Sequence, residues 1–244
     1  MEVINDLLAY DGLKIIQRQD MFNFSLDSLL LGYFAPIGYK TKRIIDLCTG
    51  NAPVPMYLTL RTNLPIDAVE IQEEVYDLAC RSIKMNKLEN QVNIIHNDLI
   101  GIHKELGVNN YELVTCNPPC FKLLESSNLN KNEYKTIARH EVAANIEDIL
   151  IESKRLLQNK GYLSMVHRPE RLTEILRLMS SHGLEPKTIR FVYPKKGTIA
   201  NTVLIDAQKG AKTGLKVLEP IFVYEYGEYS DIIREVFHYK KIML

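Results

Sequence analysis

Short apolar runs alternate with helical stripes along most of this chain, and that alternation restricts the possible folds more than any other feature. Four runs in the first half have the length and the β-branched or apolar character of strands, and each is followed by polar or turn residues: 43–48, 66–71, 92–96 and 113–116. The segment between the second and third runs has apolar residues at helical spacing, namely Val75, Leu78, Ala79 and Ile83. The first half therefore predicts strands separated by helices.

The second half continues this pattern. Its predicted elements are a helix over 146–157 that ends at the Asn-Lys-Gly signal of 159–161, a strand at 162–166, a helix over 172–179 followed by Gly183, and strands at 189–193 and 202–205. Strands that alternate with helices favour a largely parallel sheet covered on both faces. We therefore expect an α/β fold of the Rossmann-like, doubly wound type.

Composition adds few restrictions. The 244 residues are enough for one large domain or a domain with an appendage, and 30 basic residues balance 30 acidic ones, so net charge neither indicates nor excludes a nucleic-acid partner. Four cysteines without paired metal-ligand spacing predict reduced thiols and no metal site. The N-terminus has no export signal, and no apolar run reaches the roughly 20 residues of a membrane span, so we expect a cytoplasmic protein without membrane attachment.

Polar side chains stand where the predicted strands end. In an open parallel sheet ligands bind beyond these ends, so Asp46, Glu70 and Asp98 are expected near one crevice, with Gly50 allowing a tight turn. Gly50 lacks the other glycines of a dinucleotide-binding turn, which disfavours a nicotinamide cofactor. S-adenosylmethionine, which has no pyrophosphate and carries ammonium and ribose groups that carboxylates can bind, fits this set better. The alternative is that these acids cap helices or lie in solvated turns.

The fourth strand runs into Asn117-Pro118-Pro119-Cys120, followed by Phe121. Two consecutive prolines remove two backbone N–H donors and stop the strand, so the Asn117 amide and the neighbouring carbonyls point beyond the sheet. Such a rigid pair of acceptors can hold the two hydrogens of an exocyclic amine while its lone pair faces an electrophilic methyl group. The alternative is an ordinary Pro-Pro turn.

Together these segments resemble the successive motifs of class I S-adenosylmethionine-dependent amino-methyltransferases: 46–50, Glu70, 97–99 and 117–119. Residues 22–31 resemble the cofactor-capping segment of the bacterial tRNA1(Val) (adenine-N6)-methyltransferases, which act on the adenosine 3′ of the anticodon, and 139–141 and 209–229 resemble further parts of that family. The resemblance covers about residues 10 to 240. The chain departs from the family pattern at Cys120, where an aromatic residue usually follows the prolines, and at Ala52, where glycine is common.

The resemblance implies a seven-stranded, mostly parallel sheet in one methyltransferase domain over 1–244, divided into a capping segment at 1–40, a core at 41–206 and a C-terminal extension at 207–244. It implies a tRNA substrate and S-adenosylmethionine as cofactor, and leaves a monomer or a homodimer open. The implied catalytic residues are Asn117, Pro118, Pro119 and Phe121. The implied cofactor-binding residues are Phe24, Ser28, Asp46, Thr49, Gly50, Asn51, Glu70, Ile71, Asn97, Asp98, Leu99 and Asn117.

RNA also needs cationic contacts. The residues assigned to RNA are Cys120, Arg139, His140, Arg168, Lys195 and Lys196. Scattered basic residues more often form a solvated surface, and Phe121 could be a core residue instead of a plate for the flipped base. The same loop also suits a methyltransferase acting on protein glutamine, on guanine or on a small molecule, and a non-catalytic RNA-binding protein could keep the fold.

Overall fold

The structure is a computed structural model, and it describes residues 1–7, 12–18, 25–118 and 145–239. The first half contains β1 (Glu2–Asp6), β2 (Lys14–Arg18), α1 (Leu26–Phe34), β3 (Ile44–Leu47), α2 (Pro53–Leu58), β4 (Ile66–Glu70), α3 (Glu73–Met85), β5 (Val92–His96), α4 (His103–Leu106) and β6 (Tyr111–Cys116). The second half contains α6 (Ile146–Leu156), β7 (Leu157–His167), η1 (Pro169–Arg171), α7 (Leu172–Ser181), β8 (Leu184–Lys195), β9 (Thr202–Lys209), β10 (Lys216–Val217), β11 (Ile221–Glu225), β12 (Glu228–Tyr229) and α8 (Asp231–Phe237).

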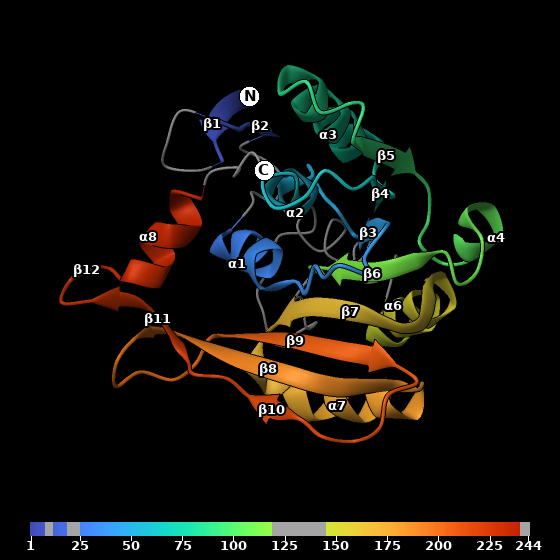
Figure 1. Cartoon of the computed structure of the whole chain (residues 1–244). Coiled ribbons are helices and arrows are strands. Elements are labelled where there is room, and N and C mark those ends of the chain that lie inside the picture. Colours follow the sequence, from blue (N-terminus) through green and yellow to red (C-terminus); the bar gives the residue numbers. More distant parts are fainter. Residues whose placement is uncertain (8–11, 19–24, 119–144, 240–244) are drawn as a thin grey trace, which may run out of the picture.

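The large sheet has the order β12-β11-β8-β9-β7-β6-β3-β4-β5, with β10 also beside β8, and its strands are stacked from β5 at the top of Figure 1 to β8 and β10 at the bottom. Strands β5, β4, β3, β6 and β7 pair in parallel, whereas β9 is antiparallel to both β7 and β8. The chain moves outward from β3 to β5 and then returns to β6 on the other side of β3. The strand order therefore reverses between β3 and β6, where α/β sheets bind their ligands.

The predicted α/β fold with a mostly parallel sheet is confirmed. The seven strands from β5 to β8 are present, but the described part of the sheet has ten strands, so the strand count was wrong. The free edge of β8 is the reason, because β10 and β11 add to it in parallel and β12 then pairs with β11. Strands β10 and β12 have two exposed residues each, too few for a sequence pattern, whereas β11 is a five-residue apolar strand that the sequence analysis did not assign.

The end of α6 also differs from expectation. The helix ends at Leu156, and Leu157 begins β7 instead of extending the helical stripe. Groups far along the chain stop the helix there: the backbone N–H groups of Asn109 and Asn110 donate to the carbonyls of Arg155 and Leu156. Their contacts satisfy carbonyls that a longer helix would use internally.

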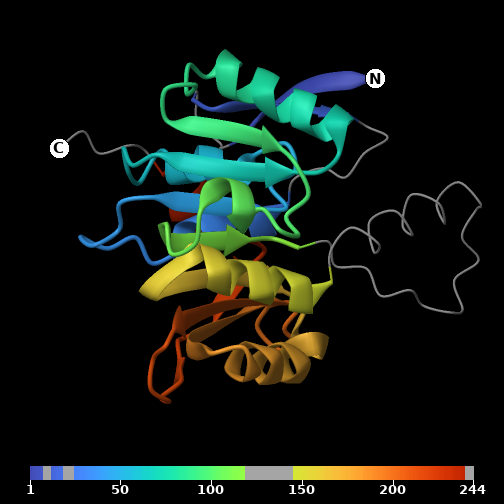
Figure 2. The same cartoon turned by 90° about the vertical axis from the view of Figure 1, so that its right-hand side faces the viewer.

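Two apolar clusters cover the two faces of the sheet. Helices α1, α2, α3 and α8 supply one cluster, and α6 and α7 supply the other, which faces the viewer in Figure 2. Successive strand residues alternate between these clusters, as Ile44 and Ile45 do on β3. Both faces are covered, which explains why the parallel strands are apolar throughout.

The N-terminal segment forms a small antiparallel sheet, β1–β2, which the sequence did not predict. It lies on α3, where the backbone N–H of Ile16 donates to Ser82 Oγ at 3.0 Å. Helix α1 follows and packs closely on α2, since a Cβ at Gly32 would lie 2.8 Å from Tyr57 Cδ1. Glycine at position 32 therefore lets α1 approach α2 closely.

Candidate functional site

The residues predicted from strand ends lie at neighbouring positions on one edge of the sheet. Asp46 on β3 pairs with Thr115 on β6 and with Ala68 on β4. Glu70 therefore ends the strand on one side of Asp46, and Asn117 follows the strand on the other side. The structure brings all three together at the point where the strand order reverses.

The turn after β3 has an unusual backbone. Cys48, Gly50 and Ala52 all have positive φ angles, of 57°, 59° and 68°, which side chains other than glycine adopt at a cost. The backbone N–H of Gly50 donates to Glu70 Oε2 at 2.9 Å, and Asn51 Nδ2 donates to the carbonyl of Ile16 at 2.9 Å. A Cβ placed on Gly50 would meet no atom of the described residues within 4 Å, so among these residues the turn leaves open space beside its backbone.

Asp46 lies beneath this turn and is only 1% exposed. Thr115 Oγ1 donates to Asp46 Oδ1 at 2.5 Å, while Asp46 Oδ2 has no hydrogen-bond partner within the described ranges, and neither does Thr49 Oγ1. Burial raises the pKa of Asp46 to about 7, the nearby hydroxyls of Thr115 and Thr49 lower it in part, and the charge of Glu70 raises it. Two buried, unpartnered oxygens beside an open turn fit a ligand that supplies a cationic donor.

The ends of β4 and β5 form the next part of the edge. Glu70 Oε1 accepts from the backbone N–H of Gln72 at 2.9 Å, so both oxygens of Glu70 are fixed by main-chain donors. Ile71 beside it is 40% exposed, which leaves an apolar surface at the strand end. Asp98 Oδ1 accepts from the N–H of Ile100, and its side chain is half-buried.

Further residues of the predicted cofactor set lie close by. The N–H of Asn97 donates to the carbonyl of Glu70 at 3.1 Å, which joins the ends of β4 and β5. Its side-chain Nδ2 donates to Glu105, and Leu99 is buried below. These contacts place 97–99 beside Glu70.

Asn117 completes the edge on the other side of Asp46. Its Nδ2 donates to Ser28 Oγ of α1 at 3.0 Å, and the serine is 2% exposed. The amide oxygen, Oδ1, accepts from no group in the described part of the chain. Pro118, which follows, is buried. Asn117 thus presents an acceptor at the sheet edge.

Comparisons with known proteins find related methyltransferases. No family model matches the chain. A tRNA1(Val) (adenine(37)-N6)-methyltransferase of Aeromonas salmonicida is 27% identical over 186 residues, which cover 75% of each chain. Seven further curated relatives, 24–30% identical, carry the same name. The chain is therefore similar to these methyltransferases over about three quarters of its length.

Solved structures confirm the fold. A predicted O-methyltransferase, protein Atu636 from Agrobacterium tumefaciens, has a TM-score of 0.68 with 20% identity and covers 86% of this chain and 94% of its own. M. jannaschii TYW2 in complex with AdoMet has a TM-score of 0.56 with 16% identity and covers 85% of each chain. The sheet is therefore that of class I methyltransferases.

The three described basic residues assigned to RNA, Arg168, Lys195 and Lys196, lie at strand ends on the same edge but differ in their contacts. Arg168 follows β7 and is held by the carbonyl of Asn201 at 2.8 Å, by Thr202 Oγ1 at 2.9 Å and by Asp27 Oδ2 at 3.2 Å. Lys195 and Lys196 end β8, which runs in the direction of β7, and both are exposed. The lysines are accessible to a partner, whereas much of the guanidinium of Arg168 is used within the protein.

Several predicted site residues lie outside the described residues: Phe24, Pro119, Cys120, Phe121, Arg139 and His140. Their assignments stay predictions. The sequence analysis missed Thr115 and Asp27, which contact Asp46 and Arg168 respectively. A threonine inside an otherwise apolar strand was the available signal for Thr115, because a buried hydroxyl needs a partner.

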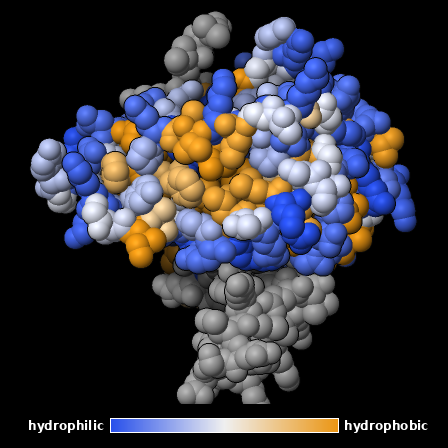
Figure 3. All heavy atoms as spheres, turned by 90° about the horizontal axis from the view of Figure 1, so that it is seen from below, coloured by the Kyte–Doolittle hydropathy of each residue, from blue (hydrophilic) through white to orange (hydrophobic). Residues whose placement is uncertain are grey.

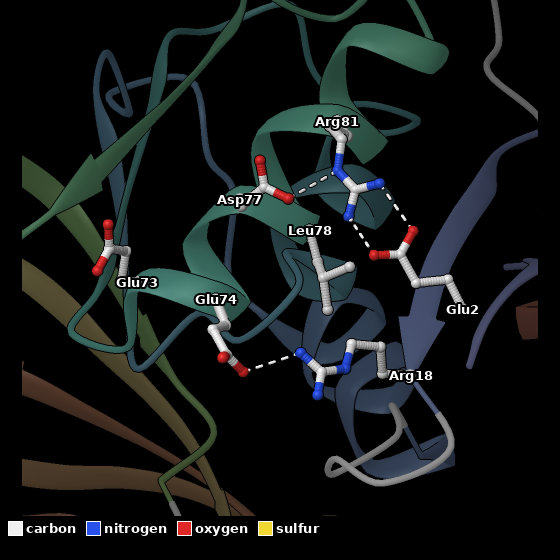
Figure 4. A pocket seen from close by; sticks show the side chains of 7 residues that line it. All are labelled: Glu2, Arg18, Glu73, Glu74, Asp77, Leu78 and Arg81. Carbon is white, nitrogen blue, oxygen red and sulfur yellow. Dashed lines mark hydrogen bonds and ion pairs between the residues drawn. The ribbon is translucent and has the colours of Figure 1, made fainter.

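A hollow lies away from this edge, between the β1–β2 sheet and α3 (Figure 4). Most of its lining residues are charged, and two ion pairs cross it, Arg81 with Glu2 and Arg18 with Glu74, while Arg81 also pairs with Asp77 within α3. The two crossing pairs join the strands to the helix. The hollow therefore belongs to the attachment of the N-terminal segment and not to the site.

Apolar side chains also gather on the side of the molecule seen in Figure 3, where β8, β10 and α7 lie. In the segment around β10, three apolar side chains are exposed, namely those of Leu215, Val217 and Leu218. Among the residues that the structure describes, no helix is long and apolar enough to span a membrane, and no cluster of His, Cys, Asp and Glu has metal-binding geometry.

Proposed function

We propose that this chain transfers a methyl group from S-adenosylmethionine to N6 of an adenosine in tRNA, namely the adenosine 3′ of the anticodon of tRNA1(Val). One observation carries this proposal: Asp46, Glu70 and Asn117 lie on three neighbouring strand ends where the sheet order reverses. Relatives that span three quarters of the chain are named for this reaction.

The residues beside the turn fit S-adenosylmethionine. Asp46 Oδ2 and Thr49 Oγ1 are buried acceptors without partners in the described ranges, and they would receive the ammonium group. Glu70 would hold the ribose hydroxyls, while Ile71 and Asp98 would border the adenine ring. Open space beside Gly50 admits the cofactor close to the backbone. When bound, the cofactor supplies an electrophilic methyl group.

Asn117 and Pro118 would act on the amine that is methylated. N6 of adenine is a poor nucleophile because its lone pair conjugates with the ring. Asn117 Oδ1 and the Pro118 carbonyl would each accept one N6 hydrogen, which directs the lone pair out of conjugation and toward the methyl group. The proton that N6 loses passes to these acceptors or to water, so positioning carries the rate instead of a strong base.

Access of the base requires that it leaves its stack in the RNA. Phe121, directly after the loop, is the proposed plate for the flipped base. Lys195 and Lys196, exposed on the same edge, are proposed contacts for RNA phosphates. Neutralising both lysines should weaken tRNA binding and reduce its salt dependence, without changing cofactor affinity.

A transfer experiment tests the proposal. Purified protein is incubated with methyl-tritiated S-adenosylmethionine and unmodified tRNA1(Val) transcript, and the product is digested to nucleosides. We expect N6-methyladenosine at the position 3′ of the anticodon, and label that disappears after ribonuclease treatment. Label in protein, label on guanine, or absence of transfer with bound cofactor would each refute the assigned substrate.

A further inference from the structure

The hydroxyl of Ser28 contacts the side-chain amide of Asn117, the proposed acceptor for the substrate amine. Family resemblance assigns Ser28 to the cofactor, but its Oγ accepts a hydrogen bond from Asn117 Nδ2 at 3.0 Å. The two residues are far apart in the sequence and meet because α1 starts at the end of β6. We propose that Ser28 is a positioning residue that holds the Asn117 amide with Oδ1 toward the substrate amine. The inference rests on the proposed function and specifies how its acceptor is oriented.

The orientation matters because the two ends of an amide have opposite character. Oδ1 accepts hydrogen bonds and Nδ2 only donates them. An amide rotated by half a turn would direct its NH₂ group at the N6 hydrogens, and the acceptor would be lost. Ser28 Oγ is the acceptor recorded for Asn117 Nδ2, so the hydroxyl favours one of the two orientations.

The position of Ser28 is itself fixed from two sides. On the inner side, Leu29, Leu30 and Leu31 are fully buried, and α1 packs against α2. On the outer side, the neighbouring Asp27 accepts from Thr202 Oγ1 at 3.0 Å and pairs with Arg168. The start of α1 is therefore joined to the ends of both β6 and β7. A hydroxyl held in this way can orient Asn117 before substrate arrives.

A double-mutant cycle tests this role. Ser28→Ala should lower kcat for tRNA methylation about tenfold, since one hydrogen bond is lost, and leave the cofactor Kd and the KM for tRNA unchanged. In an Asn117→Ala background the same substitution should have no further effect. Ser153→Ala is the matched control, because Ser153 is a fully buried helical serine whose hydroxyl has no partner in the described chain. It should retain wild-type activity.

A second measurement does not depend on activity. In ¹⁵N-labelled protein without ligands, the Asn117 side-chain NH₂ signals, identified by their loss in Asn117→Ala, should shift and exchange faster with solvent in Ser28→Ala. Unchanged signals, or an equal loss of kcat in both backgrounds, would overturn the inference. A weakened cofactor Kd at unchanged kcat would return Ser28 to the cofactor site and also overturn it.

The two proposals fail in different ways. If the wild-type protein transfers no methyl group to tRNA, the proposed function fails, and the NH₂ signals still decide whether Ser28 holds Asn117. If the wild type is active and Ser28→Ala matches it, the positioning role alone fails. Thermal melting of each variant shows that the comparison is made between folded proteins.

Discussion

Thr115 Oγ1 lies 2.5 Å from Asp46 Oδ1. Asp46 is on β3, which leads into the proposed cofactor turn, and Thr115 is on the neighbouring strand β6. The two residues are directly paired between β6 and β3, so the contact is set by sheet register. It leaves Asp46 Oδ2 as the oxygen without a partner in the described ranges. Thr115 thus orients the carboxylate that would meet the cofactor's ammonium group.

Removing this hydroxyl should weaken cofactor binding. Thr115→Val keeps the shape of the side chain but loses the donor that lowers the pKa of Asp46, so that pKa rises further. We expect about a tenfold weaker cofactor Kd at pH 7, measured by calorimetry, and a smaller difference at pH 8.5, where Asp46 ionises in both proteins. Thr115→Ser keeps the donor and should bind like wild type. Equal binding by Thr115→Val and wild type at pH 6 and 7 would contradict this role.

Cofactor affinity should also depend on pH through Asp46. Burial raises its pKa from 3.8 to about 7, so the carboxyl holds a proton below pH 7 and a cationic ligand must displace it. The Kd should rise about tenfold per pH unit as pH falls from about 7 to 5, and level off above 7. Calorimetry with S-adenosylhomocysteine, which keeps the ammonium and ribose groups, measures this. Asp46→Asn should bind weakly at every pH, and a slope that persists in this variant would assign the proton to another group.

Substitutions of Asn117 and Glu70 should affect different quantities, the rate of methyl transfer and the affinity for the cofactor. Asn117→Ala removes an acceptor for the amine and should reduce the single-turnover rate about 10²–10³-fold at saturating cofactor, with little change in cofactor Kd. Glu70→Gln should weaken the cofactor Kd and leave the saturated rate near that of wild type. Tritium transfer and calorimetry on the two variants measure both quantities. Reversed effects would exchange the roles proposed for these residues.

The strand-end residues could be predicted because each follows an apolar run of strand length. This pattern identifies Asp46, Glu70 and Asn117 without any knowledge of which strands pair. Thr115 and Ser28 act through contacts with residues 69 and 89 positions away, and nothing in local sequence fixes that register. The same limit explains the early end of α6, whose carbonyls are capped by Asn109 and Asn110.

A second buried carboxyl gives a prediction that concerns stability. Asp206 on β9 is 5% exposed, and its Oδ1 has no partner in the described part of the chain. Burial raises its pKa from 3.8 to about 8, and Ser164 and the charge of Arg61 offset only part of this. The folded state therefore keeps a proton between about pH 4 and 8 that the unfolded chain releases, so the free energy of unfolding falls as pH rises through this range.

Asp206→Asn should remove this decrease in the free energy of unfolding at high pH, because the amide needs no proton to remain neutral. We expect the variant to be more stable than wild type by about 2–4 kcal/mol at pH 8 and by much less at pH 4.5, as measured by urea unfolding without cofactor. Glu225→Gln, at an exposed carboxyl on β11, is the matched control and should follow the wild-type pH profile. Equal pH dependence in wild type and Asp206→Asn would mean that Asp206 is already ionised in the folded protein, which requires a cation or water beside Oδ1.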